Sequence, residues 1–168
     1  GIGFGWHAGN RWWGPGIHNS LVLSNNAEGF YHYYIDISGS QSLINNLSYK
    51  FKYMVSDEIQ NWESDDYYFS AWFLNVKYNV LEFGMSRNIL SGGYRDLPWS
   101  LFDAITLLLN NKNSRYWDSI NEYYLLANFP ESGLEIFIDI GFPNRSYAGQ
   151  DPEVFYDHAM GSNIGLRK

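Results

Sequence analysis

The chain has 168 residues, no cysteine and a formal net charge of -7 at pH 7. This length suits one domain, and we predict a single domain over residues 1–168. The acidic balance argues against nucleic acid as a partner, and without cysteine neither a disulfide framework nor a thiolate metal site can form.

Aromatic residues make up 19% of the sequence, more than a small soluble core needs. They indicate large exposed or interfacial surfaces, such as a sugar-binding face, a partner interface or the aromatic girdles of a membrane barrel. No apolar run is long enough for a transmembrane helix, but alternating strands need none. Because the sequence begins within what reads as a strand, we expect it to be an internal piece of a longer protein.

Alternating apolar and polar residues predict strands in the first third of the chain. Residues 1–8 alternate apolar side chains with glycine and His7. Residues 30–38 and 46–55 alternate over about nine residues each, close to the roughly 9 to 11 that a bilayer-spanning strand needs. The link at residues 39–42 reads as a turn, and the acidic segment 56–66 has the composition of a surface loop.

The middle of the chain is less regular. Residues 67–77 are apolar on both faces, so this strand could pass between two apolar surroundings. A tight turn at Tyr78 and Asn79 leads into the alternating segment 80–86. Ser100 can cap a helix whose apolar stripe ends near Asn111, which predicts one short loop helix.

Strands return in the last third. Residues 121–129 and 134–141 alternate around a turn, a polar loop follows over residues 143–157, and a weaker strand is predicted over residues 158–166. The predicted fold class is therefore all-β, with about eight or nine antiparallel strands and one loop helix. Such alternation fits an outer-membrane β-barrel with a lipid face and a wet lumen, and it fits a soluble sandwich or jelly roll equally well.

The stretch over residues 9–26 matches neither a helix nor an ordinary strand. It combines two adjacent indoles, a cation and a Gly-Pro-Gly turn, and it ends in Ser-Asn-Asn. Indole faces stack on the C–H faces of sugars, while Arg and Asn give directional hydrogen bonds to hydroxyls. This composition indicates a shaped polar surface suited to carbohydrate.

Several blocks of sequence resemble the Wzi capsule-assembly family of bacterial outer-membrane proteins. They are GNRWWGPG at residues 9–16, SLVLSNNA at 20–27, LEFGMSR at 81–87 with Gly92 and Gly93 just after it, and a looser block over 101–113. The resemblance implies a Gram-negative outer-membrane β-barrel that acts as a lectin and helps attach capsular polysaccharide at the cell surface. The chain would be a central part of the family's usual length, with about half the strands of its barrel.

The candidate carbohydrate-binding residues come from these blocks. They are Arg11, Trp12, Trp13, His18, Asn25, Asn26 and Arg87. Each also has a structural interpretation. The tryptophans could anchor a fixed loop, the arginines could join internal ion pairs, and the asparagines could form a turn.

Catalytic patterns are weak. The histidines His7, His18, His32 and His158 lack metal-ligand spacing, and no nucleophile elbow or phosphate loop is present. Five carboxylates could pair in space as in a glycosidase: Glu82, Asp103, Glu122, Glu135 and Asp139. We predict no enzyme, no cofactor and no metal.

The predicted function is therefore binding and attachment of capsular or surface polysaccharide by an outer-membrane barrel. Its partners would be that polysaccharide, outer-membrane lipid and other outer-membrane proteins. Two alternatives stay open: a non-enzymatic structural subunit of a larger outer-membrane complex, in which residues 11–13 lie buried, and a soluble carbohydrate-active β-sandwich.

Overall fold

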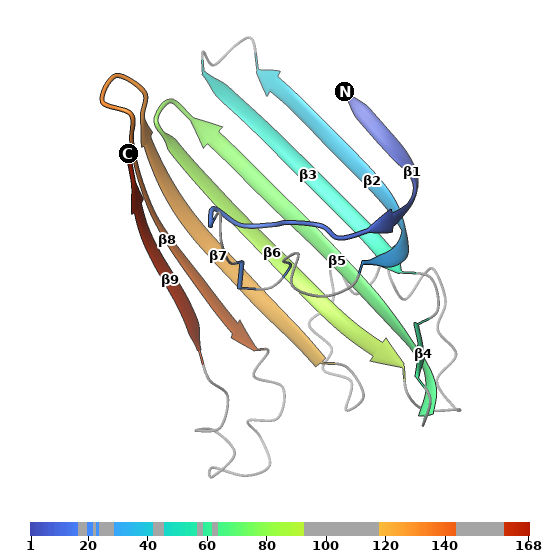
Figure 1. The fold of residues 1–168 in the computed structure, drawn as a ribbon. Coiled ribbons are helices and arrows are strands. Elements are labelled where there is room, and N and C mark those ends of the chain that lie inside the picture. Colours follow the sequence, from blue (N-terminus) through green and yellow to red (C-terminus); the bar gives the residue numbers. More distant parts are fainter. Residues whose placement is uncertain are drawn as a thin grey trace, which may run out of the picture.

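The structure, a computed structural model, describes residues 1–16, 20, 21, 23, 29–41, 46–56, 59–61, 64–92, 118–143 and 160–168. Within these ranges the chain forms nine strands of one sheet (Figure 1). They are β1 (Ile2–Gly9), β2 (Phe30–Gln41), β3 (Leu47–Ser56), β4 (Ile59–Asn61), β5 (Ser64–Tyr78), β6 (Leu81–Gly92), β7 (Asp118–Phe129), β8 (Leu134–Pro143) and β9 (Gly161–Arg167).

Strands that follow one another in sequence lie side by side. The order is β1-β2-β3-β5-β6-β7-β8-β9, with the short β4 paired to β5, and every pairing is antiparallel. This confirms the predicted all-β antiparallel class. The sheet is not closed. β1 and β9 lie at opposite edges, and in the described part of the chain each pairs on one side only, β1 with β2 and β9 with β8 (Figure 1).

The two faces of the sheet differ sharply. One face, which we call the apolar face, exposes large hydrophobic side chains on eight of the nine strands. Among them are Phe4, Ile35, Tyr49, Tyr78, Phe83, Leu125, Ile138 and Ile164. The other face carries His32, Lys52, Asn75, Glu122 and Asp139. The segment after β1 crosses this second face over β5, β6 and β7 (Figure 1), so we call it the loop face.

The hydrophobic core lies between that segment and the loop face. Trp13 packs there with Met54, Ala71, Phe73, Tyr124, Leu126 and Phe137. This explains why β5 is apolar on both sides: Ala71 and Phe73 contact the core, while Trp72 and Leu74 belong to the apolar face. The core supplies one of the two apolar surroundings predicted for this strand, and the other stays a prediction.

Tight turns join neighbouring strands. Asn79 adopts a positive φ of 54° between β5 and β6, and Asn46, at 68°, precedes β3. The Asn46 Nδ2 group donates to Asn79 Oδ1 at 2.8 Å. Asparagine tolerates the left-handed region because its side chain bonds locally. The predicted turns near 78–79 and 130–133 are confirmed, with Asn79 and Val80 forming the first.

Other predicted boundaries need correction. Residues 39–41 are not a turn, because Gly39, Ser40 and Gln41 pair with β3 and extend β2. The predicted loop 56–66 contains β4 and the start of β5, which pair with each other. The last strand covers Gly161–Arg167 rather than 158–166. The loop predicted over 143–157 begins after Pro143, which belongs to β8, and its other residues and the helix predicted after Ser100 lie outside the described residues.

Among the described elements, no helix is long and apolar enough to cross a membrane.

Candidate functional site

Arg11 is fixed on the loop face by two contacts from β2. Its Nε–H donates to His32 Nε2 at 2.8 Å, and its guanidinium lies 4.5 Å from the centre of the Tyr34 ring. Because His32 Nε2 accepts this hydrogen bond, the ring proton is on Nδ1, which donates to the Phe30 carbonyl oxygen at 2.9 Å. His32 is fully buried and therefore orients the half-buried Arg11.

The two tryptophans have different surroundings. Trp12 is half-buried, and its Nε1–H donates to the Gly16 carbonyl oxygen at 2.8 Å. This bond links the residues on the two sides of the Gly-Pro turn. Trp13 is only 3% exposed, and its ring centre lies 5.5 Å from that of Phe73. The sequence left open whether the tryptophans stack on sugars or anchor the loop. The burial of Trp13 fits a loop anchor, whereas Trp12 keeps accessible surface.

A narrow gap, too small to hold a water molecule, lies beside Arg11. It is lined by Arg11, Trp13, Tyr34, Asp36, Lys52, Tyr53 and Met54. Asp36 and Lys52 face each other across β2 and β3. A cation, a phenol and an adjacent Asp–Lys pair give hydrogen-bonding groups of both polarities, which is the chemistry needed to bind polyhydroxylated or acidic sugars.

Gly14 lies over two buried carboxyl groups from neighbouring strands. Glu122 on β7 and Asp139 on β8 are both 0% exposed. A Cβ atom on Gly14 would lie 3.1 Å from Glu122 Oε1, 3.3 Å from Ser20 Oγ and 3.6 Å from Asp139 Oδ2. Gly14 also has a φ of +108°, so both its backbone and its missing side chain suit this position.

The carboxyl pair is only partly hydrogen-bonded. Ser86 Oγ–H donates to Glu122 Oε2 at 2.8 Å, and Asn88 Nδ2 donates to Ser86 Oγ at 3.0 Å. Glu122 Oε1 and both oxygens of Asp139 are buried and receive no hydrogen bond from the side chain of a third residue, and the two carboxyl groups contact each other. Buried carboxyl oxygens are costly in this state, so these three atoms call for a positive partner or a shared proton.

The other candidate carboxylates do not converge on this pair. Glu82 Oε1 accepts hydrogen bonds from Tyr124 Oη at 2.9 Å and Asn75 Nδ2 at 2.8 Å. Glu135 lies at the turn end of β8, and Asp103 is outside the described residues. Glu122 and Asp139 are therefore the one pair brought together among the candidates that the structure describes.

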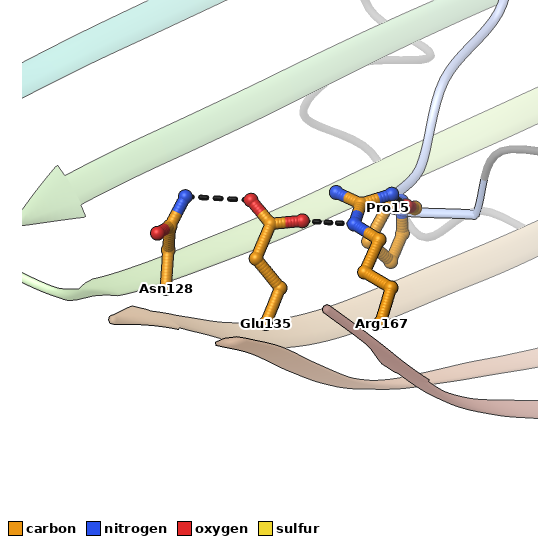
Figure 2. Close-up of polar contacts among 4 residues, drawn as sticks. All are labelled: Pro15, Asn128, Glu135 and Arg167. Carbon is orange, nitrogen blue, oxygen red and sulfur yellow. Dashed lines mark hydrogen bonds and ion pairs between the residues drawn. The ribbon is translucent and has the colours of Figure 1, made fainter. Parts of the chain in front are cut away.

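Glu135 joins the loop segment to the last strand. It forms an ion pair with Arg167 on β9 and accepts from Asn128 Nδ2 at 2.6 Å (Figure 2). Arg167 Nη1 in turn donates to the Pro15 carbonyl oxygen at 3.4 Å. Figure 2 shows Arg167 between Glu135 and Pro15, so the far edge of the sheet helps to hold the Gly-Pro-Gly turn.

Arg87 does not join Arg11 in one site. It lies on the apolar face, where its cross-strand neighbours are Trp72 on β5 and Asn121 on β7, whereas Arg11 contacts the loop face. Its Nε is buried without a hydrogen-bond partner, as are Trp72 Nε1 and the hydroxyl of the next neighbour, Tyr53. The remaining candidates, His18, Asn25 and Asn26, lie outside the described residues.

Comparisons with protein-family models, curated proteins and solved structures found no match. The resemblance to the Wzi family therefore rests on the sequence blocks quoted above and stays a prediction.

Sequence reasoning missed two features of the loop face. It did not single out His32 as the partner of Arg11, and it did not pair Glu122 with Asp139. The alternation predicted for residues 121–129 and 134–141 placed each acid opposite the apolar side chains of its strand. The hairpin register around the predicted turn at 130–133 makes the two acids diagonal neighbours. No three His, Cys, Asp or Glu side chains gather into a metal-binding group in the described ranges.

Proposed function

We propose that this chain forms part of the wall of a bacterial outer-membrane β-barrel, whose loop face binds capsular or other surface polysaccharide and helps attach it to the cell. The barrel part rests on one observation above all. A single antiparallel sheet exposes apolar side chains along one face while it buries carboxyl groups on the other. A barrel wall needs this division, because lipid covers one face and the other lies toward the lumen.

The open edges support the same proposal. The outward backbone groups of β1 and β9 have no strand to pair with in the described part of the sheet. In lipid each unpaired group would cost several kcal/mol, roughly, so further strands must continue the sheet at both edges. Those strands would come from flanking parts of a longer chain or from a partner protein in the outer membrane.

The binding part of the proposal rests on Arg11 and Trp12. Arg11 is held by His32 and Tyr34, so its guanidinium has little freedom left to lose on binding. Trp12 remains partly accessible beside it. A fixed planar cation next to an accessible indole can hydrogen-bond sugar hydroxyls or carboxylates while it stacks on a pyranose ring.

Two experiments test the proposal in order. The full-length protein is first extracted from membranes and run on a gel with and without boiling, with the band identified by mass. A heat-modifiable band above 19.5 kDa supports a closed barrel that contains this chain. A species of this mass that stays in solution without detergent would instead favour the soluble carbohydrate-active sandwich.

The second experiment measures polysaccharide retention by cells that express Trp12→Ala or Arg11→Gln. We expect both variants to lose retention while the heat-modifiable band is kept. Trp6→Ala is the matched control, because Trp6 is an exposed indole on the apolar face, where it stacks on Tyr31 at 4.8 Å. Full retention by well-folded Trp12 and Arg11 variants would refute the binding assignment.

The burial of Trp13 favours a second candidate, a structural barrel subunit without lectin activity. In that case Arg11, like Trp13, would only fix the loop. Retention would then follow the stability of each variant, and a Trp12→Ala protein as stable as the wild type would leave retention intact.

A further inference from the structure

We propose that Glu122 and Asp139 form an oxygen-ligand site for a divalent cation of the Ca²⁺ type, which fastens the Gly14 turn to the barrel wall. The site is independent of polysaccharide binding and uses side chains of the loop face that have no other role. Histidine and cysteine spacing cannot reveal it, because its ligands are oxygen atoms.

Three oxygens gather beside Gly14. They are the three heavy atoms nearest to the position at which a Gly14 side chain would begin, at 3.1 Å for Glu122 Oε1, 3.3 Å for Ser20 Oγ and 3.6 Å for Asp139 Oδ2. They come from β7, β8 and the loop segment, yet they point toward one small region. Ser20 Oγ also contacts the Trp13 carbonyl oxygen, which adds a neutral oxygen nearby.

The two buried acids lack a cationic partner. Glu122 and Asp139 are both 0% exposed and contact each other, and three of their four oxygens receive no hydrogen bond from the side chain of a third residue. Neither residue forms a salt bridge with a cationic side chain in the described part of the chain, whereas Glu135 pairs with Arg167. Carboxylates, hydroxyls and carbonyls are the ligands that Ca²⁺ takes, in flexible geometry and with water completing the shell.

The surrounding bonds orient the site. Asn88 Nδ2 donates to Ser86 Oγ, which donates to Glu122 Oε2, so the chain of bonds turns the free Oε1 of Glu122 toward Gly14. Such outer contacts commonly fix metal-ligating carboxylates. A cation here would join two wall strands to the loop that carries Arg11 and Trp12.

Terbium is a direct probe, because it replaces Ca²⁺ and emits when a nearby tryptophan is excited. Trp13 precedes Gly14 and supplies that tryptophan. The full-length protein in detergent is freed of metal with EDTA and titrated with Tb³⁺ alone, and Ca²⁺ is then added as a competitor. We expect saturable emission in the wild type that Ca²⁺ removes.

The variants locate the site. Glu122→Gln and Asp139→Asn each remove a negative ligand and should weaken Tb³⁺ binding by at least about tenfold. Glu82→Gln is the control and should bind like the wild type, because Glu82 is a carboxylate on the same face that accepts hydrogen bonds from Tyr124 and Asn75. Absence of saturable emission in the wild type, or unchanged affinity in Asp139→Asn, would overturn the proposal and leave a shared proton as the neutralising partner.

A second readout does not depend on variants that fold poorly. Trypsin can cut after Arg11 only when the loop leaves His32 and Tyr34. Ca²⁺ should therefore slow this cut in the wild type by the same factor by which its binding lowers the population of the undocked loop. Ser20→Ala, which lies outside the wall strands, should reduce the protection. Equal cutting rates with Ca²⁺ and with EDTA would also overturn the site, whether or not the protein binds polysaccharide.

Discussion

Replacement of Trp13 with alanine should release the loop from the wall. Trp13 is 3% exposed and packs on Phe73 with ring centres 5.5 Å apart, and truncation of a buried tryptophan costs about 3–5 kcal/mol. The strands keep their ladder hydrogen bonds in the variant, so we expect the loss to appear as local undocking. At the lower limit of about 3 kcal/mol, the undocked population rises by about a hundredfold.

The rate of tryptic cleavage after Arg11 reports this population. The Arg11 side chain is held by His32 and Tyr34, and it reaches the protease only from the undocked loop. When docking is fast relative to cleavage, the rate follows the open population, so Trp13→Ala should be cut about a hundredfold faster. Cleavage is followed by mass spectrometry of the native protein in detergent.

Two comparisons make this test decisive. Trp6→Ala removes an exposed indole from the apolar face and should change the rate by no more than about twofold. A synthetic peptide of residues 5–20 with and without the substitution corrects for any effect on trypsin itself. If Trp13→Ala is cut within about threefold of the wild-type rate, Trp13 is not the anchor of the loop and the packing argument is wrong.

Three further predictions use urea unfolding in detergent or polysaccharide retention. Gly14→Ala should destabilise the loop more than Gly133→Ala, since both glycines have positive φ but only at Gly14 would the added Cβ atom lie closer to oxygens than an ordinary van der Waals contact; similar losses of about 1 kcal/mol for both would contradict this. Arg87→Leu should leave polysaccharide retention unchanged and should leave the free energy of unfolding unchanged or raise it by up to about 1 kcal/mol, because the buried Nε of Arg87 lacks a hydrogen-bond partner. A loss of retention would show that Arg87 belongs to the binding site. Gly84→Ala should cost about 1–3 kcal/mol, because the Tyr124 ring packs directly on the glycine; no change in the unfolding midpoint would show that the ring moves freely.

The faces of the sheet could be predicted from the sequence because each strand buries different chemistry on its two sides. Phe83 and Met85 alternate with Glu82 and Gly84, and the structure places these pairs on opposite faces. A slip of one residue would reverse every side chain, so such a pattern specifies its register strongly. The same reasoning placed Phe4 and Ile35 on the apolar face.

Composition was less informative where pairing overrides local preference. Gly39 and Ser40 look like turn residues, yet they extend β2 because Tyr49 and Ser48 lie opposite them. Strand preference depends on what each residue packs against, which a single sequence does not reveal.

The candidate site was predictable only in part. The unusual composition of residues 9–16 identified the segment that crosses the loop face, and Arg11 and Trp12 keep the exposure that binding needs. Arg87 was grouped with them by resemblance, but its side chain lies on the opposite face. Glu122 approaches Asp139 because of the register of β7 against β8, which follows from the predicted turn at 130–133, but the burial of both acids beside Gly14 could not be predicted from the sequence.

The contact between Pro15 and Arg167 has a consequence for the order of folding. These residues are 152 positions apart, and between them Leu21 packs against Gly141 and Gly161 of β8 and β9. The surface on which the segment after β1 docks is therefore incomplete until β9 has paired with β8. Contacts of such long sequence separation form slowly, because loop closure must precede any gain from them. Docking of this segment is thus a late event in folding. The time at which Arg11 becomes protected from trypsin would therefore report when the sheet is complete.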